Sequence, residues 1–145
     1  MVTFPKSIPS ALAAALILSI LSGKVDARII KKVTIEETGL NANPNDEMFA
    51  RDCKHFKPTA TQIKSFFSKA YSVPRRWAIN ERYAPCYATG SIMFDDFGPA
   101  RWSISSGGVG SLSWTDGDDV YLFYRHNNWV DPTACSYGTG DKLEC

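Results

Sequence analysis

The fold is decided by two consecutive stretches of similar design, SIMFDDFGPARWSIS (residues 91–105) and SLSWTDGDDVYLFYR (residues 111–125). Each stretch has an alternating apolar run, a turn rich in Asp and Gly, and a second alternating run. Alternation with a period of two is typical of a strand with one buried face, and an Asp-Gly turn favours a tight hairpin. The segment from Tyr87 to Arg125 therefore predicts a four-stranded antiparallel meander.

One face of this meander is predicted to be buried. The residues with inward parity are Ala88, Gly90, Ile92, Phe94, Ala100, Trp102, Ile104, Leu112, Trp114, Val120, Leu122 and Tyr124. The opposite face carries Tyr121 and Phe123, which is unusual for a face that should meet water. Either the Gly107-Gly108 pair inverts the parity of the second hairpin, or this face meets a partner, because an exposed apolar patch often marks a partner site.

One clear helix precedes the meander. Thr59, followed by Gln62 three residues later, fits a capping box. Apolar residues then recur at helical spacing from Ile63 to Ala70, which gives a single apolar stripe. Pro74 prevents continuation, so we expect the helix to end near residues 71–72. Packing this stripe on the sheet predicts an α+β domain with one main N-terminal helix on a four-stranded antiparallel meander, held together by disulfides.

The segments around this helix are less regular. Residues 29–35 are rich in β-branched residues and are predicted to form a short strand, followed by a loop over residues 38–46. Asn45 is predicted to cap a short helical turn. Residues 75–85 are predicted to form an irregular crossover into the sheet, and residues 126–132 a turn that leaves it.

The chain begins with the features of a secretory signal. Lys6 precedes an apolar run from Ala11 to Leu21, and Val25-Asp26-Ala27 matches a small-residue cleavage pattern. This run is shorter than the roughly 20 residues that span a bilayer, which disfavours a retained anchor helix. We expect residues 1–27 to be a signal peptide and residues 28–145 a single domain. The predicted location is periplasmic or secreted, without stable membrane insertion.

The charge balance bears on the class of partner. Removal of residues 1–27 lowers the number of Lys and Arg from 16 to 14 and the number of Asp and Glu from 15 to 14, so the formal net charge falls from +1 to 0. Non-specific binding to nucleic acid or to an anionic membrane surface requires a basic excess. We therefore expect no nucleic-acid partner.

All four cysteines, Cys53, Cys86, Cys135 and Cys145, follow the predicted signal. An even number in an exported chain predicts two disulfides, for which three pairings are possible. We favour Cys86–Cys135, which would tie the start of the sheet to the loop after it, with Cys53–Cys145, which would fix the C-terminus. The spacing contains no CxxC or HxxxH pair of the kind that zinc sites use, so no metal or other cofactor is expected.

The signals for catalysis are weak. The chain has two histidines, His55 and His126, and no G-x-S-x-G, HExxH or P-loop motif. The run Ser105-Ser106-Gly107-Gly108 and the Asp residues of 116–119 are typical of turns. We expect no catalytic set; His126, at the end of a strand, is the one histidine that could face a ligand.

The residues that favour binding are aromatic and basic, which are the types enriched at interface hot spots. In the crossover they either cap the core or form a contact surface. The predicted binding residues are Arg75, Arg76, Trp77, Tyr83, Tyr121, Phe123, Arg125, His126 and Trp129.

Two motifs carry a resemblance to a known group. Pro85-Cys86-Tyr87-Ala88-Thr89-Gly90 and the Ala-x-Trp-x-Ile run of residues 100–104 resemble small exported bacterial proteins in which a helix precedes such strands. The resemblance covers about residues 56–124 and implies a helix followed by a meander, but no activity. The layout is also similar to that of periplasmic or secreted inhibitors that present a sheet to an enzyme, which is an analogy of fold alone.

These observations favour an exported, non-enzymatic binding protein with a protein partner. It would be an inhibitor or immunity-type protein acting on an envelope enzyme or toxin. One alternative is a structural or assembly component of the bacterial envelope. The other is a small cell-wall hydrolase built around His126.

Overall fold

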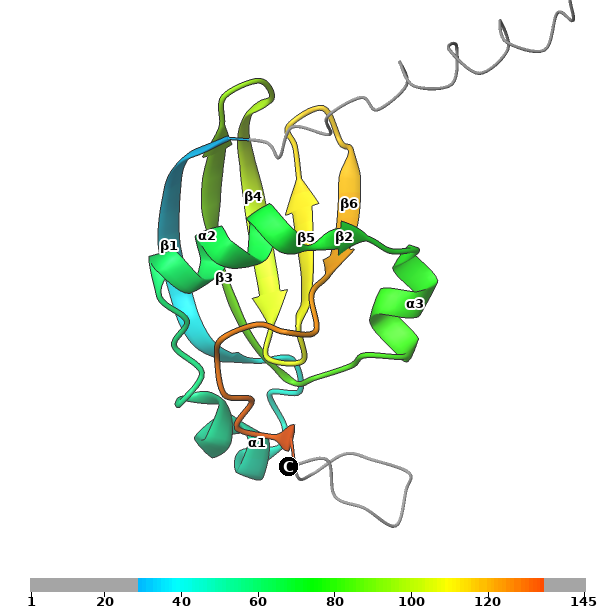
Figure 1. The fold of residues 1–145 in the computed structure, drawn as a ribbon. Coiled ribbons are helices and arrows are strands. Elements are labelled where there is room, and N and C mark those ends of the chain that lie inside the picture. The colour runs from blue at the N-terminus through cyan, green and yellow to red at the C-terminus, as the bar shows by residue number, and fades with distance from the viewer. Residues whose placement is uncertain (1–28, 135–145) are drawn as a thin grey trace, which may run out of the picture.

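The fold is an antiparallel sheet with helices, seen in a computed structural model that describes residues 29–134 (Figure 1). The strands are β1 (Ile30–Asn41), β2 (Tyr71–Ser72), β3 (Cys86–Phe94), β4 (Gly98–Ser105), β5 (Val109–Ser113) and β6 (Asp119–Phe123). The helices are α1 (Glu47–Cys53), α2 (Ala60–Lys69) and α3 (Arg75–Asn80). The predicted signal peptide, Cys135 and Cys145 lie outside the described residues.

The sheet has six strands in the order β1-β3-β4-β5-β6-β2, and all neighbouring strands are antiparallel. The α+β class and the meander of β3 to β6 are confirmed, but the count of four strands is wrong. β1 adds one edge and continues to Asn41 through the predicted loop, because its far end still pairs with Cys86. β2, at the other edge, has only two residues, which is too short to show an alternating pattern.

The prediction of one main helix is also wrong in number. α2 has the predicted capping box: the Thr59 N–H donates to Gln62 Oε1 at 2.8 Å, and the Gln62 N–H donates to Thr59 Oγ1 at 3.3 Å. α1 is capped by Asp46 instead of Asn45, since Asp46 Oδ1 accepts from the Phe49 N–H at 3.0 Å. α3 occupies the segment that was predicted to be irregular. It has six residues and buries one of them, so no apolar stripe marks it.

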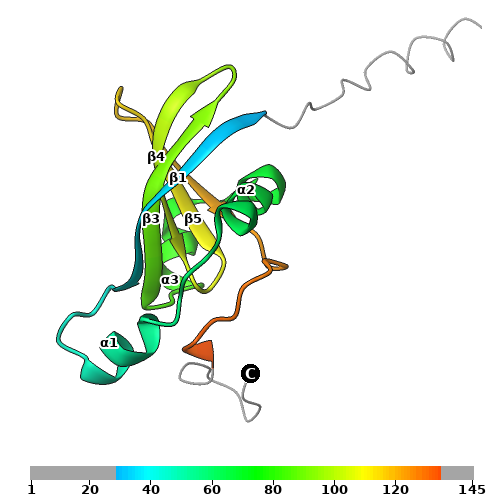
Figure 2. The same ribbon diagram turned by 90° about the vertical axis from the view of Figure 1, so that its left-hand side faces the viewer.

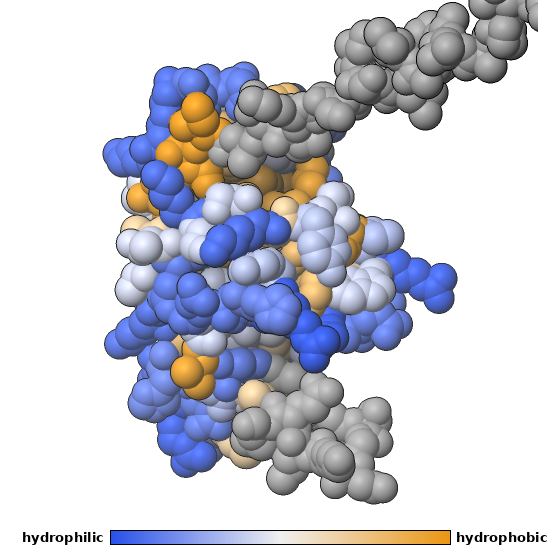
Figure 3. Space-filling view, viewed as in Figure 1, coloured by the Kyte–Doolittle hydropathy of each residue, from blue (hydrophilic) through white to orange (hydrophobic). Residues whose placement is uncertain are grey.

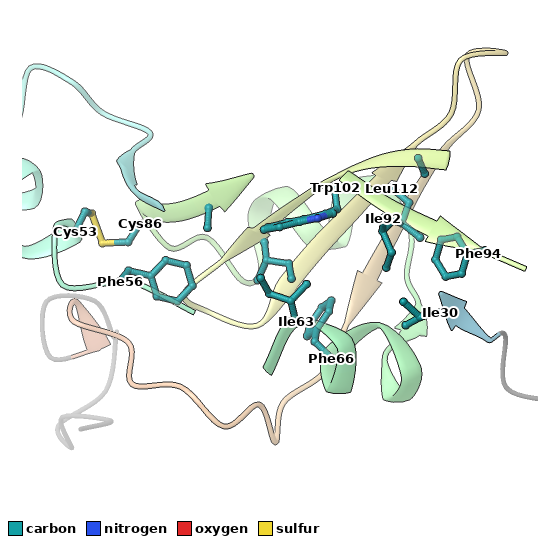
Figure 4. Close-up of a cluster of buried hydrophobic side chains, with 13 residues drawn as sticks. Ile30, Cys53, Phe56, Ile63, Phe66, Cys86, Ile92, Phe94, Trp102 and Leu112 are labelled. Atoms are coloured by element: carbon teal, nitrogen blue, oxygen red, sulfur yellow. A yellow bond between two sulfur atoms is a disulfide. The ribbon is translucent and has the colours of Figure 1, made fainter. Parts of the chain in front are cut away.

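The core lies between α2 and the face of the sheet that α2 crosses (Figures 1 and 4). Ile63 and Phe66 of α2 are 0% and 1% exposed. They pack in one cluster with sheet residues that include Ile92, Trp102 and Ile104. The predicted inward parity is confirmed: of the residues with this parity, Ala88, Gly90, Ile92, Phe94, Ala100, Trp102, Ile104 and Leu112 are buried, while Trp114, Val120, Leu122 and Tyr124 are partly buried.

A disulfide joins Cys53, at the end of α1, to Cys86, at the start of β3, with their Cα atoms 4.9 Å apart. The predicted pairings Cys86–Cys135 and Cys53–Cys145 are therefore wrong. The C-terminal end of β1 runs beside the start of β3, and α1 directly follows β1 in the chain. This arrangement brings Cys53 of α1 next to Cys86 of β3. The Ala42 N–H donates to the Pro85 carbonyl at 2.8 Å, at the same place.

None of the helices within residues 29–134 is long and apolar enough to cross a membrane.

Candidate protein-binding site

The site is built on Phe123 of β6. This residue has the parity opposite to Leu122, so its ring leaves the sheet on the face that α2 does not cover. It is only 4% exposed, because Trp77 of α3 packs on it at 4.9 Å between ring centroids. The Arg82 guanidinium carbon lies 5.4 Å from the same ring centroid, and the Tyr71 ring lies edge-on at 5.8 Å. Phe123 thus anchors α3 and β2 to this edge of the sheet.

A polar contact fixes the beginning of α3. Arg75 Nε donates to the Tyr121 hydroxyl at 3.2 Å. Nearby, the Val73 N–H donates to the Tyr121 backbone carbonyl at 2.9 Å, which continues the pairing of β2 with β6. Side-chain and backbone contacts therefore hold α3 in one position relative to the sheet.

Exposed aromatic, aliphatic and basic side chains lie on the elements that Phe123 anchors. Tyr71, Ile79 and Tyr83 are 57%, 45% and 53% exposed. Arg76 and Ile79 are spaced at i and i+3, which places them along one side of α3, and Tyr83 follows the end of the helix. We refer to the exposed residues Tyr71, Arg75, Arg76, Ile79 and Tyr83 as the α3 patch.

The α3 patch is basic. Arg75, Arg76 and Arg82 lie in or directly after α3, against the single acidic residue Glu81. In the space-filling view the apolar surface gathers above α2, toward the upper end of the sheet (Figure 3). The α3 side of that view is mostly hydrophilic to neutral. This is expected, because Arg is hydrophilic and Tyr nearly neutral on a hydropathy scale.

The structure brings four of the predicted binding residues into direct contact at this site: Arg75 with Tyr121, and Trp77 with Phe123. Of the two explanations offered for Tyr121 and Phe123, the inversion of parity is wrong. The face does meet something at Phe123, but it is α3 of the same chain, and Phe123 is therefore not itself available to a partner.

The other predicted binding residues are divided among the α3 patch, the end of β6 and the segment that follows it. Arg76 and Tyr83 are exposed in the α3 patch, whereas Arg125 and His126 are exposed after the end of β6. The His126 ring lies 6.2 Å from that of Tyr124.

Trp129 lies away from the α3 patch. It packs between the rings of Phe56 and Phe66, at centroid distances of 5.8 and 5.6 Å. Its Nε1 donates to the Ser106 carbonyl at 2.9 Å. Trp129 thus tethers the segment after β6 to the α2 side of the core.

Two patch residues were missed by sequence reasoning. Tyr71 was placed at the end of the main helix, but Ala70 leaves the helix with ψ of 144° and Tyr71 begins β2. Ile79 falls in the segment that was predicted to be a crossover. The signal for both was the cluster of aromatic and basic residues in 71–83, which marks a surface without showing which side chains face outward.

The other chemical groups have ordinary surroundings. Within residues 29–134, no three His, Cys, Asp or Glu side chains are grouped so that they could hold a metal ion. In the β5–β6 turn, Asp116 Oδ1 accepts from the Asp118 N–H at 3.4 Å, and Gly117 has a positive φ of 95°. These Asp residues therefore act as turn residues in this hairpin.

Phe123→Ala is expected to lower the free energy of unfolding by about 3 kcal/mol, since it removes a buried ring and leaves a cavity beneath Trp77. Chemical denaturation followed by fluorescence measures the change. The matched control is Phe97→Ala, because Phe97 is 55% exposed, and it should cost much less. Equal losses for the two variants would show that Phe123 does not anchor α3.

No family model, no curated protein and no solved structure matches this chain. The resemblance to small exported bacterial proteins stays a prediction, and the function is argued from the site alone.

Proposed function

We propose that this chain is an exported, non-enzymatic binding protein that engages a partner protein through the α3 patch. One observation carries the proposal: Tyr71, Ile79 and Tyr83 are exposed, as are Arg75 and Arg76, on β2, α3 and the residues after α3, next to the buried Phe123 that anchors these elements. Tyr and Arg are the residue types that dominate interface hot spots.

The anchored arrangement favours binding because it reduces the conformational entropy that is lost when the complex forms. Binding is weaker when flexible side chains must first be immobilised. Here Arg75 already donates to Tyr121, and the Tyr71 ring already packs on Phe123. The helix itself is held by Trp77 on the same ring. Much of the patch is therefore arranged before a partner arrives.

The charge of the patch indicates the character of the partner. Three Arg against one Glu within residues 75–82 favour a partner with an acidic surface. Complementary charge of this kind raises the association rate and makes it sensitive to salt. An envelope enzyme or toxin with an acidic face fits, and the chain would act on it as an inhibitor or immunity-type protein.

Export is part of the proposal. The Cys53–Cys86 disulfide supports it, because such bonds form and persist in oxidising compartments. The predicted signal peptide of residues 1–27 would direct the chain there, into the periplasm or the medium.

Affinity capture tests this function. The chain, expressed with its own leader and purified after export, is used as bait for envelope extract under non-reducing conditions, at low and at high salt. We expect one stoichiometric enzyme or toxin, retained at low salt and reduced at high salt. Capture of a large membrane complex instead would favour the assembly role.

A turnover assay supplies the opposite test. If the purified chain alone hydrolyses cell-wall material, and His126→Ala abolishes this while the fold is kept, the binding proposal is wrong. The expected result is no turnover by either protein.

A further inference from the structure

The outer edge of β1 is open. β1 is the first strand in the sheet order and pairs with β3 alone, and Figure 2 looks onto its free side. Near its C-terminal end the Gly39 N–H donates to the Phe56 carbonyl at 2.9 Å, which closes the edge there. Among the described residues, no other backbone group bonds to the outer edge of residues 31–38. An unpaired edge of this length can accept a further strand.

The charges along this edge are arranged symmetrically. Residues 30–38 read IKKVTIEET, with two Lys before Thr34 and two Glu after it, at equal distances. All four charged side chains are exposed. If a second copy runs antiparallel with Thr34 opposite Thr34, Lys32 lies opposite Glu36, and Lys31 lies opposite Glu37. A two-fold axis makes each pairing twice, and opposite charges on facing strands stabilise the pair.

Only one antiparallel register pairs all four charged residues. A shift by one residue keeps one of the two Lys–Glu combinations, a shift by two residues loses both, and a parallel in-register pairing places Lys opposite Lys. Charges of one sign would suffice to protect an edge from pairing. Charges of both signs, in this order, select one register as well.

The middle of this edge is regular. Lys32 to Ile35 keep an unbroken register with β3, and register shifts at Lys31 and at Glu36 flank this stretch, within the charged residues. Val33 and Ile35 share the face of α2 and are half-buried, so they would lie opposite each other between the copies. Lys31 already pairs with Asp95, and Arg101 Nη2 lies 2.7 Å from Glu36 Oε2. Both ion pairs are exposed, which leaves room for a second partner.

We propose that two copies of this chain associate through β1, antiparallel and centred on Thr34, so that their sheets become one continuous sheet. The α3 patch lies at the opposite end of the strand order, beside β6 and β2. Each dimer therefore presents two patches at its outer ends, which would add avidity toward a clustered partner. The dimer does not depend on the proposed function, since it uses a different surface.

Charge reversal with remixing tests the proposal. The exported chain is measured by sedimentation over a concentration series, as wild type and as the variants K31E/K32E and E36K/E37K. We expect the wild type to reach the mass of two chains, and each variant alone to lose the dimer because its edge carries one sign. An equimolar mixture of the two variants should recover the mass of two chains, since every facing pair is then opposite in charge.

Matched controls place the same charge changes elsewhere. K54E/K57E and E47K/E81K alter exposed residues outside β1 and should keep the dimer. Circular dichroism checks that all variants are folded. A wild type that stays monomeric at every concentration would overturn the proposal. So would variants that dimerise like wild type, or a mixture that remains monomeric.

Discussion

Gly90→Ala is expected to lower the free energy of unfolding by at least about 4 kcal/mol, above the usual cost of overpacking, because the new atom meets backbone. A Cβ at Gly90 would overlap the Thr34 carbonyl oxygen of β1 and lie 2.6 Å from Cζ2 of Trp102. The Trp102 indole covers Gly90 and donates to the Ser91 carbonyl at 3.1 Å. Neither neighbour can move without disturbing the β1–β3–β4 pairing.

Denaturant unfolding of Gly90→Ala is compared with that of Gly98→Ala. Gly98 has a positive φ of 70° and open space around its missing side chain, so alanine there meets only backbone strain. That strain costs about 1 to 2 kcal/mol. A Gly90→Ala protein as stable as Gly98→Ala would contradict the close approach of β1 and Trp102.

Removal of the disulfide by Cys53→Ala with Cys86→Ala is expected to lower the free energy of unfolding by about 4 kcal/mol. The bond closes a loop across 33 residues of sequence, and the chain-entropy model gives this value for such a loop. Alanine is used because both sites are fully buried. A serine hydroxyl there would add the cost of burying a polar group.

The loss of local stability should be largest in α1. This helix has seven residues, too few to be stable alone, and Cys53 is its buried residue. Hydrogen exchange of the α1 amides should accelerate more than that of α2, which keeps its capping box and packed face. Unchanged exchange in α1, or a stability loss below about 1 kcal/mol, would show that the bond is not what holds α1.

Local patterns made the meander and α2 predictable. Alternation in residues 91–105 and 111–125, together with the Asp-Gly turn, depends only on neighbours in sequence. The same is true of the Thr59–Gln62 capping box. These signals also gave the inward parity of the sheet, including buried Trp102 and Leu112.

The missed elements depend on contacts between distant residues. β2 exists because Tyr71 and Ser72 pair with Phe123 and Leu122 across about 50 residues of sequence. The Cys53–Cys86 pairing follows from β1 returning to the start of β3, which cysteine spacing alone does not reveal. Trp77 of α3 packs on Phe123, so the helical state of this short segment depends on a tertiary contact.

The sequence predicted which residue types make up the candidate site better than it predicted how they are arranged. Sequence reasoning selected Arg75, Arg76, Trp77 and Tyr83, which lie in or directly after α3. It could not separate buried anchors from exposed contacts, because a strand side chain such as Phe123 can be covered by an element whose position is unknown. It also grouped Trp129 with them, although this residue packs on Phe56 and Phe66.

The central claim is that the α3 patch binds a partner, and parallel capture by two charge variants tests it most directly. R75E/R76E reverses the patch, while K54E/K57E makes the same change in charge near α1. Both baits are incubated with the same envelope extract as the wild type, and the captured protein is quantified by mass spectrometry. We expect R75E/R76E to lose at least about nine-tenths of the captured partner, as a hot-spot loss of 1.4 kcal/mol or more implies. K54E/K57E should retain it. Equal capture by the two variants would contradict the account.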